Sequence, residues 1–429
     1  ERQHLAAIEL ASGSIVGRWT IPDPVFPNDI SIDDEGTVYI SDTRSGNWPE
    51  SRIYRFRHGD WDVFANEGIS RSNGIWIHDA RTGQDIFWEW GLFSFSQTGF
   101  IPRLVRGTML YSMGGRELSR ALEVYRRQGR NVWAQELALT PEQAAALDRF
   151  VRNNARPENR QYVYNYYLDN CSTRVRDALD SVLGGRLRQT FEGQPTGRTW
   201  RWHTRRLLSP APAADLGIQI ALGTPVDQEI DAWQEMFLPL RLRAHLASAT
   251  VDGAGGPLVV RERLLVEGTM EAPSQEPANR FPFAVVTGVA LGLLTGFLGR
   301  WAVRSSLGRR ALGVWIVVWG GVLGLVGLML AASWVGTDHD FWRWNENLLY
   351  ANPLLLAAPF LAIPLIRGLD PSPRLRELLR WVRWVALGAV VLKLVPGIFV
   401  QENWEIVAAL VPTHMMLART FPLSDDPSV

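Results

Sequence analysis

Hydrophobic and polar residues alternate strictly in parts of the first 75 residues. Two such stretches, Ile30–Ile32 and Val38–Ile40, flank the turn-forming residues Asp33–Gly36. A period of two is typical of a β-strand with one buried face, and a polar run ending in glycine favours a tight turn. A further short strand is predicted over Arg52–Phe56. We therefore expect the N-terminal region to be a β-meander.

From about residue 103 the pattern predicts helices separated by short strands. Helices are expected over Gly115–Gly129 and from near Asp169 to Leu183, and another opens at Thr140. There the Thr140 hydroxyl can cap the helix, a proline takes the first helical position, and Gln143 completes a capping box. Strands are expected over Gly74–His78, Ile86–Phe93 and Thr108–Met113, and linkers over Pro210–Ala214 and Glu267–Arg280.

The last third of the chain contains apolar runs long enough to cross a bilayer. Four of them approach the roughly 20 residues that a spanning helix needs: Phe281–Leu298, Ala311–Val335, Ala351–Ile366 and Trp384–Val400. A fifth run, Ile406–Leu417, is shorter and suits an interfacial or re-entrant helix. No amphipathic segments remain to cover four helices that are apolar on every side, which argues against a soluble core. We therefore predict an all-α transmembrane region.

The loops between these runs differ in charge. Residues 300–310 carry four arginines and no acid, and residues 367–383 carry five arginines. The loop between them, Gly336–Tyr350, has three acids against one arginine, and we expect its polar groups to contact the soluble domain. The positive-inside rule puts the arginine-rich loops in the cytoplasm. The protein is thus expected in the bacterial inner membrane, in contact with the lipid bilayer, with its soluble region in the periplasm.

Composition narrows the chemistry. Lys and Arg total 44, as do Asp and Glu, so the net charge of zero gives no reason to expect a nucleic-acid partner. The single cysteine excludes an intramolecular disulfide and a cysteine-cluster metal site, and no cofactor is expected. Lys393, inside the fourth run, is expected to snorkel or pair with a polar group, with a transport role as the alternative. No signal segment precedes Glu1, so we expect the natural N-terminus to lie upstream.

The segment from residue 162 to 180, YVYNYYLDNCSTRVRDALD, concentrates reactive side chains. Asp169 or Asn170 can cap a helix whose first turn contains Cys171. A helix N-terminus and a nearby cation such as Arg174 favour the thiolate form, which a nucleophilic cysteine requires. The alternative is a buried, inert cysteine.

Several motifs around this cysteine resemble the bacterial Lnb N-terminal periplasmic domain family. They are GIWIHDARTG, WGLFSF, WAQELALTPEQ, PENRQYVYNYYLDNCSTRVRDALD and TWRWHTRRLL, and the later TDHDFWRWNENLLYANPL resembles the membrane region that usually follows. The resemblance covers residues 74–429 and implies an α+β, circularly permuted papain-like fold of the NlpC type. It implies hydrolysis of, or acyl transfer from, an amide or ester by a thiol. The site residues that it implies are Cys171 as nucleophile, with Asn170, Arg174 and His203 in support.

The chain departs from this family just before the strand that begins at Gly74. The family usually has Gly-His-Asn there, whereas this chain has Arg71, Ser72 and Asn73. His78 is six residues further along, roughly 20 Å away in a strand, so it cannot take the place of the missing base. Some family members are thought to assist the folding of a partner enzyme. A second hypothesis is therefore a non-catalytic scaffold or chaperone for a periplasmic or outer-membrane partner.

Residues 9–78 resemble one to two blades of a gluconolactonase-type six-bladed β-propeller. The resemblance rests on SGSIVGRWTIPDPVFPNDISIDDEGTVYISDT, RIYRFRHGDWDVFA and SRSNGIWIHDARTG. It implies that Asn28 and Asn73 line a cavity, in which one such asparagine binds a divalent metal. Propellers close with four to eight blades, so these residues make only an incomplete one, and lactonase activity is a minor alternative. We interpret the chain as a join, near residues 73–80, between a propeller fragment and an Lnb-like protein.

The predicted organisation is thus a propeller-like fragment at 1–73, an Lnb-like periplasmic domain at 74–266, a linker at 267–280, a transmembrane region at 281–420 and a tail at 421–429.

Overall fold

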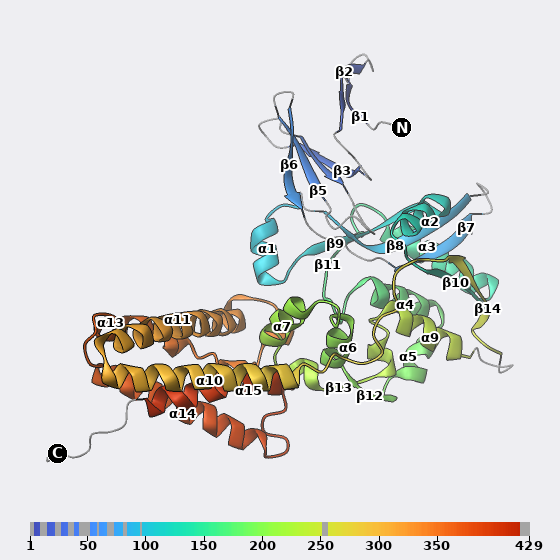
Figure 1. Ribbon diagram of the computed structural model, residues 1–429. Coiled ribbons are helices and arrows are strands. Elements are labelled where there is room, and N and C mark those ends of the chain that lie inside the picture. The colour runs from blue at the N-terminus through green and yellow to red at the C-terminus, as the bar shows by residue number, and fades with distance from the viewer. Residues whose placement is uncertain are drawn as a thin grey trace. The chain divides into compact units, whose positions relative to one another are not determined.

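The computed structural model describes residues 4–8, 15–21, 27–32, 38–42, 52–57, 60–66, 73–79, 84–94, 97–250 and 256–420. The chain divides into two compact units (Figure 1). The first consists of Glu1–Leu104, Thr108–Gln194 and Asp231–Ala272, and the second of Val105–Gly107, Pro195–Ile230 and Pro273–Val429. The stretch 195–230, which the sequence placed in the periplasmic domain, thus groups with the predicted transmembrane region.

The N-terminal strands form two small antiparallel sheets. β1 (His4–Ile8) pairs with β2 (Ile15–Thr20). β3 to β6 form a four-stranded meander with the bounds Pro27–Ile32, Val38–Asp42, Arg52–Arg57 and Asp60–Asn66, so the predicted meander is confirmed. The propeller resemblance is not supported. The described residues form no closed barrel or propeller, and β7 (Asn73–Asp79), which the resemblance included, pairs with a strand of the next sheet.

That next sheet underlies the candidate site. β8 (Gln84–Phe93) pairs with β7 on one side and with β9 (Leu110–Glu117) on the other, and β9 also pairs with β11 (Gln161–Val163). All these pairs are antiparallel, and the order in space is β11-β9-β8-β7. The strands predicted from residue 74 onward are therefore confirmed. Helix α4 (Cys171–Val182) packs against β7 and β8.

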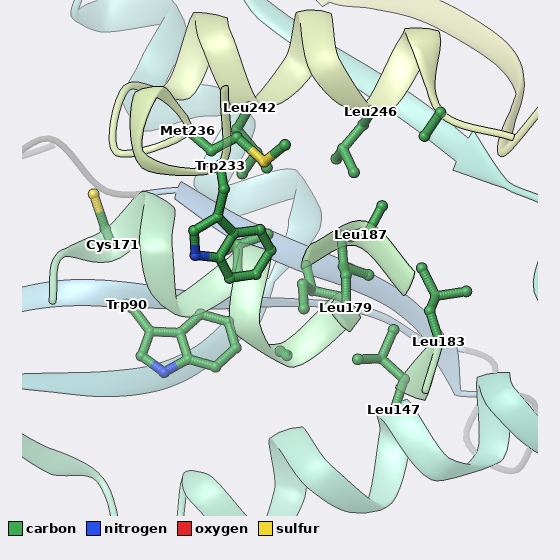
Figure 2. Packing of buried hydrophobic residues seen from close by; sticks show 14 of the residues in the cluster. Trp90, Leu147, Cys171, Leu179, Leu183, Leu187, Trp233, Met236, Leu242 and Leu246 are labelled. Carbon is green, nitrogen blue, oxygen red and sulfur yellow. The ribbon is translucent and has the colours of Figure 1, made fainter. Parts of the chain in front are cut away.

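One hydrophobic core joins α4 to the rest of the first unit (Figure 2). Trp90 and Met113 enter it from the sheet, Leu179 enters it from α4, and Met236 enters it from a turn. The surrounding elements are α2 (Leu118–Arg127), α3 (Pro141–Asn154), α5 (Arg186–Phe191), α8 (Ala232–Glu235), α9 (Pro239–Ser248) and the paired strands β10 (Val132–Leu137) and β14 (Val259–Val266). The short helix α1 (Phe100–Arg106) begins in the first unit and ends in the second.

Two sequence predictions need correction here. The helix predicted over Gly115–Gly129 begins only at Leu118, because β9 continues to Glu117 and pairing with β8 satisfies its backbone. The linker predicted over Pro210–Ala214 is wrong, since α7 (Pro212–Ala221) starts within it. Proline at the first helical position costs nothing, because its missing N–H would be unbonded there anyway. The helix opened by Thr140 is confirmed as α3, with the predicted capping box.

The second unit combines short polar elements with long apolar helices. The polar part contains β12 (Pro195–Thr199), α6 (Trp200–Leu207), α7, η1 (Thr224–Asp227) and β13 (Glu229–Asp231), whose last residue belongs to the first unit. The apolar part contains α10 (Phe281–Arg304), α11 (Ser306–Gly336), η2 (Asp340–Trp342), η3 (Glu346–Leu349), η4 (Pro353–Ala357), α12 (Ala358–Leu361), α13 (Ile363–Ile366), α14 (Pro373–Lys393) and α15 (Trp404–Arg419).

α10 and α11 form an antiparallel hairpin that reverses at Ser305. Ser305 caps α11 by accepting a hydrogen bond from the backbone N–H of Gly308 at 2.9 Å. Trp315 Nε1 donates to Thr295 Oγ1 at 3.0 Å, so residues ten positions on either side of the turn face each other. The two helices therefore run side by side in opposite directions (Figure 1).

Glycines allow α15 to approach α10 at backbone distance. A Cβ atom at Gly288 would lie 2.0 Å from the Ala408 carbonyl oxygen, and one at Gly299 would lie 2.6 Å from the Thr420 side chain. Residue numbers rise in the same direction along both helices from the first contact to the second, so α15 runs parallel to α10. Close packing through small residues is a usual way for helices to associate in membranes, where lipid gives no hydrophobic driving force.

Two helices, α10 and α11, are long and apolar enough to cross a membrane. A third crossing is available if η2–η3 and η4–α13, bent by 60°, act as one broken span, which includes most of the third predicted span, Ala351–Ile366. The fourth predicted span is not a continuous helix: α14 starts earlier, includes four arginines, and ends at Lys393. The fifth run is helical as α15, with 16 residues.

The ends of the second unit differ in charge. Arg309 Nε donates to the Gly368 carbonyl oxygen at 2.6 Å, so the two arginine-rich loops meet at one end of the helices. Gly327 of α11 packs against Ala351, whereas Gly313 of the same helix packs against Leu365. The segment after the acidic loop therefore starts beside the far end of α11 and returns towards the arginines.

Candidate functional site

Cys171 is the first residue of α4, as predicted. Asn170 precedes it as N-cap, and the cap is reciprocal: Asn170 Oδ1 accepts from the backbone N–H groups of Ser172 and Thr173 at 2.8 and 3.0 Å, and Thr173 Oγ1 accepts from the Asn170 N–H at 2.8 Å. The positive end of the helix dipole favours an anion at this position. Cys171 is buried, as in the alternative of an inert cysteine, and belongs to the hydrophobic cluster, where Figure 2 shows its side chain pointing away from Trp90.

Asn170 fixes the start of α4 to the neighbouring chain. Its Nδ2 group donates to the Tyr166 and Phe237 carbonyl oxygens at 3.0 Å each. Ser172 Oγ donates to the Met236 carbonyl oxygen at 2.8 Å. These groups are buried, so each bond offsets the cost of removing a polar group from water. Asn170 therefore holds Cys171 in place through the backbone.

Three tyrosines lie on one face of the sheet. Tyr111 of β9 and Tyr162 of β11 are direct cross-strand partners, and Tyr164 follows two residues later. Directly opposed residues and residues two apart share a face, so all three side chains point the same way. The rings of Tyr111 and Tyr164 stack with centroids 4.1 Å apart. Tyr162 is 7% exposed, and its hydroxyl is shielded from solvent without a hydrogen bond to any described residue.

These tyrosines are electrostatically coupled to the thiol. Burial raises the pKa of Tyr111, Tyr162 and Tyr164, and the negative charge of an ionised Cys171 raises it further. All three phenols therefore stay protonated near neutral pH and keep an O–H available for donation. No carboxylate is among the causes that act on all three; Asp169 contributes only at Tyr162.

Arg174 adds a positive charge one turn into α4. Its Nη2 donates to Asp169 Oδ2 at 2.6 Å, and its guanidinium lies 4.3 Å from the Tyr162 ring centroid. Both partners of the ion pair are about a third exposed, so solvent weakens their attraction. The ion pair lies beside the predicted site. The supporting role of Arg174 stays a prediction.

The predicted histidine partner belongs to the other unit. His203 lies buried in α6 and makes an edge-to-face contact with Trp202, with ring centroids 4.9 Å apart, whereas Cys171 lies in the first unit. His245 of the first unit is bonded to Glu235 through Nε2, at 2.9 Å. Ser72 and the side chain of His78 are outside the described residues. The choice of base therefore stays a prediction.

The described residues do not suggest a metal site beyond the one predicted from sequence. Within the described ranges, no group of three or more His, Cys, Asp or Glu residues is placed to hold a metal ion. Asn28 lies on β3 and Asn73 begins β7, in two separate sheets, and their side chains are outside the description. Their metal role stays a prediction that depended on the propeller resemblance.

The second unit contains a buried polar cluster that the sequence indicated only through Lys393. Lys393 Nζ donates to Glu346 Oε2 at 2.7 Å and also to the Gln401 carbonyl oxygen. Glu346 Oε1 accepts from the Gln401 N–H at 2.8 Å, and Gln401 Oε1 accepts from the Glu346 N–H at 2.7 Å. Gln401 Nε2 donates to the Leu222 carbonyl oxygen at 3.0 Å. Lys393 therefore pairs, one of its two predicted outcomes.

The same cluster binds the acidic loop to the stretch 195–230. Asn345 Nδ2 donates to the Ala221 carbonyl oxygen at 3.0 Å, and Asn347 Nδ2 donates to that of Gln219 at 3.0 Å. Next to them, Arg201 and Asp227 form a buried ion pair at 2.6 Å. The expected contact between this loop and residues assigned by sequence to the soluble domain is thus observed, inside the second unit.

The chain therefore combines a mixed α/β unit, with a capped cysteine helix on an antiparallel sheet, and a unit with two helices able to cross a membrane. Residues 77–210 match the family model described as the Lnb N-terminal periplasmic domain, which includes Cys171 and His203. A search of curated proteins and a search of solved structures gave no match. The periplasmic domain family and the two apolar helices fit a membrane-anchored protein.

Proposed function

We propose that this chain is anchored in the bacterial inner membrane and that its Lnb-like domain, in the periplasm, transfers or hydrolyses acyl groups through Cys171. The observation that carries the proposal is the position of the thiol at the first residue of a fully capped helix. The helix dipole favours the thiolate form of such a thiol, whereas burial among apolar side chains opposes it, so the proposal requires the dipole to outweigh burial.

The reaction would follow the usual course of a cysteine acyl transfer. The Cys171 thiolate attacks the carbonyl carbon of an amide or ester, and the carbonyl oxygen becomes an oxyanion. Collapse of this intermediate expels the amine or alcohol, which takes up a proton, and leaves an acyl thioester. Water or a second acceptor then releases the acyl group and returns the thiolate. The protonated phenol of Tyr162 is available to donate to the oxyanion.

A second function is favoured by one specific residue. Position 72, where the resemblance expects the histidine base, is serine, and a serine hydroxyl does not accept a proton near neutral pH as imidazole does. The alternative is a non-catalytic scaffold or chaperone, in which Asn170 and Arg174 serve only to hold α4. Only the catalytic proposal needs His203, or another base from outside the sheet, to accept the thiol proton.

The rate of thiol alkylation as a function of pH distinguishes the two. We expect iodoacetamide to label the full-length protein with a midpoint below the ordinary thiol pKa of about 8.5. Restoring the base by Ser72→His should increase the rate at pH 7, because imidazole would share the thiol proton. A midpoint at or above 8.5, unmoved by Ser72→His, would leave only the scaffold. Cys171→Ser, the matched control, gives the background labelling.

A further inference from the structure

The arginine-rich end of the second unit carries positive charge that its own acids do not neutralise. It comprises the α10–α11 turn, the stretch around Gly368 and the first half of α14. Only Asp370 and Glu377 are acidic there, and among the described residues no arginine of this end forms an ion pair. The arginines are Arg300, Arg304, Arg309, Arg310, Arg367, Arg374, Arg376, Arg380 and Arg383.

Three of them form a stripe along α14. Arg376, Arg380 and Arg383 are spaced by four and three residues, which places them on one face of the helix. Each is partly exposed, and the Nε of each is shielded from solvent without a hydrogen bond to a described residue. The stripe borders the face that packs into the bundle, because the residue preceding each arginine is buried. These guanidinium groups therefore lie on one helix face and have N–H donors that are not used in hydrogen bonds to described residues.

Two tryptophans indicate what surrounds the stripe. Trp381 and Trp384 are 64% and 60% exposed, and the Arg383 guanidinium lies 4.7 Å from the Trp384 ring centroid. Exposed tryptophans gather at the headgroup level of a bilayer, where the ring meets acyl chains and its N–H meets polar groups. Helix α10, which ends at the same arginine-rich end, also exposes large apolar side chains, such as Phe297 at 61%. A lipid surface is the environment that suits all of these groups.

We propose that the first half of α14 is a binding site for an anionic phospholipid, with Arg376, Arg380 and Arg383 holding its phosphate and Trp381 and Trp384 flanking its glycerol region. The planar guanidinium fork donates two parallel hydrogen bonds to phosphate, which makes arginine a better ligand than a point charge. Charge complementarity selects an anionic over a zwitterionic lipid, because three arginines here lack a carboxylate partner. The site is independent of any chemistry at Cys171.

The test uses full-length protein in detergent micelles and measures the binding of phosphatidylglycerol and phosphatidylcholine by native mass spectrometry. We expect the wild type to retain phosphatidylglycerol selectively. Arg376→Gln/Arg380→Gln/Arg383→Gln should weaken this binding about 100-fold, since each arginine near an anionic surface is worth roughly a factor of five. The matched control, Arg300→Gln/Arg304→Gln/Arg374→Gln, removes the same charge from the same end and should change it less than about threefold.

A second variant separates charge from geometry. Replacing the three stripe arginines by lysine keeps the net charge but removes the planar fork, so affinity should fall to a value between the wild type and the glutamine variant. Circular dichroism establishes that each variant is folded. Equal losses in the stripe and control variants, or no selectivity in the wild type, would overturn the proposal. Binding of an acidic protein in place of the lipid would do the same.

Discussion

A buried polar cluster in the second unit and a buried tyrosine in the first differ in their hydrogen bonding. In the second unit, Lys393, Glu346 and Gln401 satisfy one another through four hydrogen bonds. Gln401 also donates to Asn345 and to the Leu222 carbonyl oxygen. In the first unit, the buried Tyr162 hydroxyl makes no hydrogen bond to a described residue. Complete networks make a structure rigid and unique, whereas a buried group left without a bond calls for an explanation such as a ligand. The contrast makes the Tyr162 hydroxyl, which is electrostatically coupled to Cys171, a candidate contact for a ligand.

The largest expected effect is the loss of one member of the complete network. Lys393→Met leaves the Glu346 carboxylate buried without its cation, which should lower the free energy of unfolding of the second unit by about 3–5 kcal/mol. Thermal unfolding of the full-length protein in detergent measures it. Lys393→Met/Glu346→Gln removes both charges and should recover most of the loss. A single variant as stable as the wild type would show that the network is not structural.

The next effect compares two capping boxes within the first unit. Asn170→Ala removes the helix cap and also leaves the carbonyl groups of Tyr166 and Phe237 without their donor. We therefore expect the free energy of unfolding to fall by roughly 2–4 kcal/mol. The control Thr140→Ala removes an exposed cap of the same type and should cost about 1 kcal/mol. Chemical denaturation measures both. Equal losses would contradict the role of Asn170 in fixing the start of α4.

Alkaline pH should weaken the first unit through its tyrosines. Their pKa is raised in the folded protein, so the folded state binds these protons more tightly than the unfolded chain. The stability that they contribute is complete below the unfolded pKa of about 10 and is lost as pH rises above it, by about 1.4 kcal/mol per pH unit for each tyrosine.

Comparing wild type with Tyr162→Phe between pH 9 and 11 tests this sign. The variant lacks one titrating proton, so its stability should fall less steeply above pH 10 than that of the wild type. Identical slopes would indicate that Tyr162 titrates as it does in water.

The smallest effect concerns the partly exposed pair beside the site. Arg174→Gln should change stability by less than about 1 kcal/mol, because solvent already screens the attraction to Asp169. The same change should slow alkylation of Cys171 at pH 7 a few-fold, since it removes a cation that favours the thiolate. A large loss of stability with unchanged alkylation would make Arg174 a structural residue only.

Much of the local structure was readable from sequence. The capping residues at Thr140 and Asn170, the N-terminal meander and the two long apolar helices followed from short-range signals, and all are observed. The third and fourth spans were harder to predict. Prolines break the third predicted span into short helices. The helix of the fourth span, α14, begins before its apolar run and includes four arginines.

The candidate site was predicted only in part. Cys171 and Asn170 are neighbours in the chain, so their relation was visible in the motif. Tyr111 became part of the site only through strand pairing with Tyr162, which links residues 51 positions apart and leaves no local signal. The assignment of His203 to a different unit likewise depends on long-range packing, which binds residues 195–230 to the loop around Asn345.

The reversal at Ser305 has a consequence for biogenesis. A chain that enters a bilayer and turns back at once returns to its starting compartment, so the residues before Phe281 and those after Gly336 emerge together. The hydrogen bond from Gly223 N–H to the Phe341 carbonyl oxygen at 2.8 Å joins those two stretches. An error in membrane insertion can therefore invert the hairpin as a whole. It cannot place the stretch before α10 and the stretch after α11 on opposite sides of the membrane.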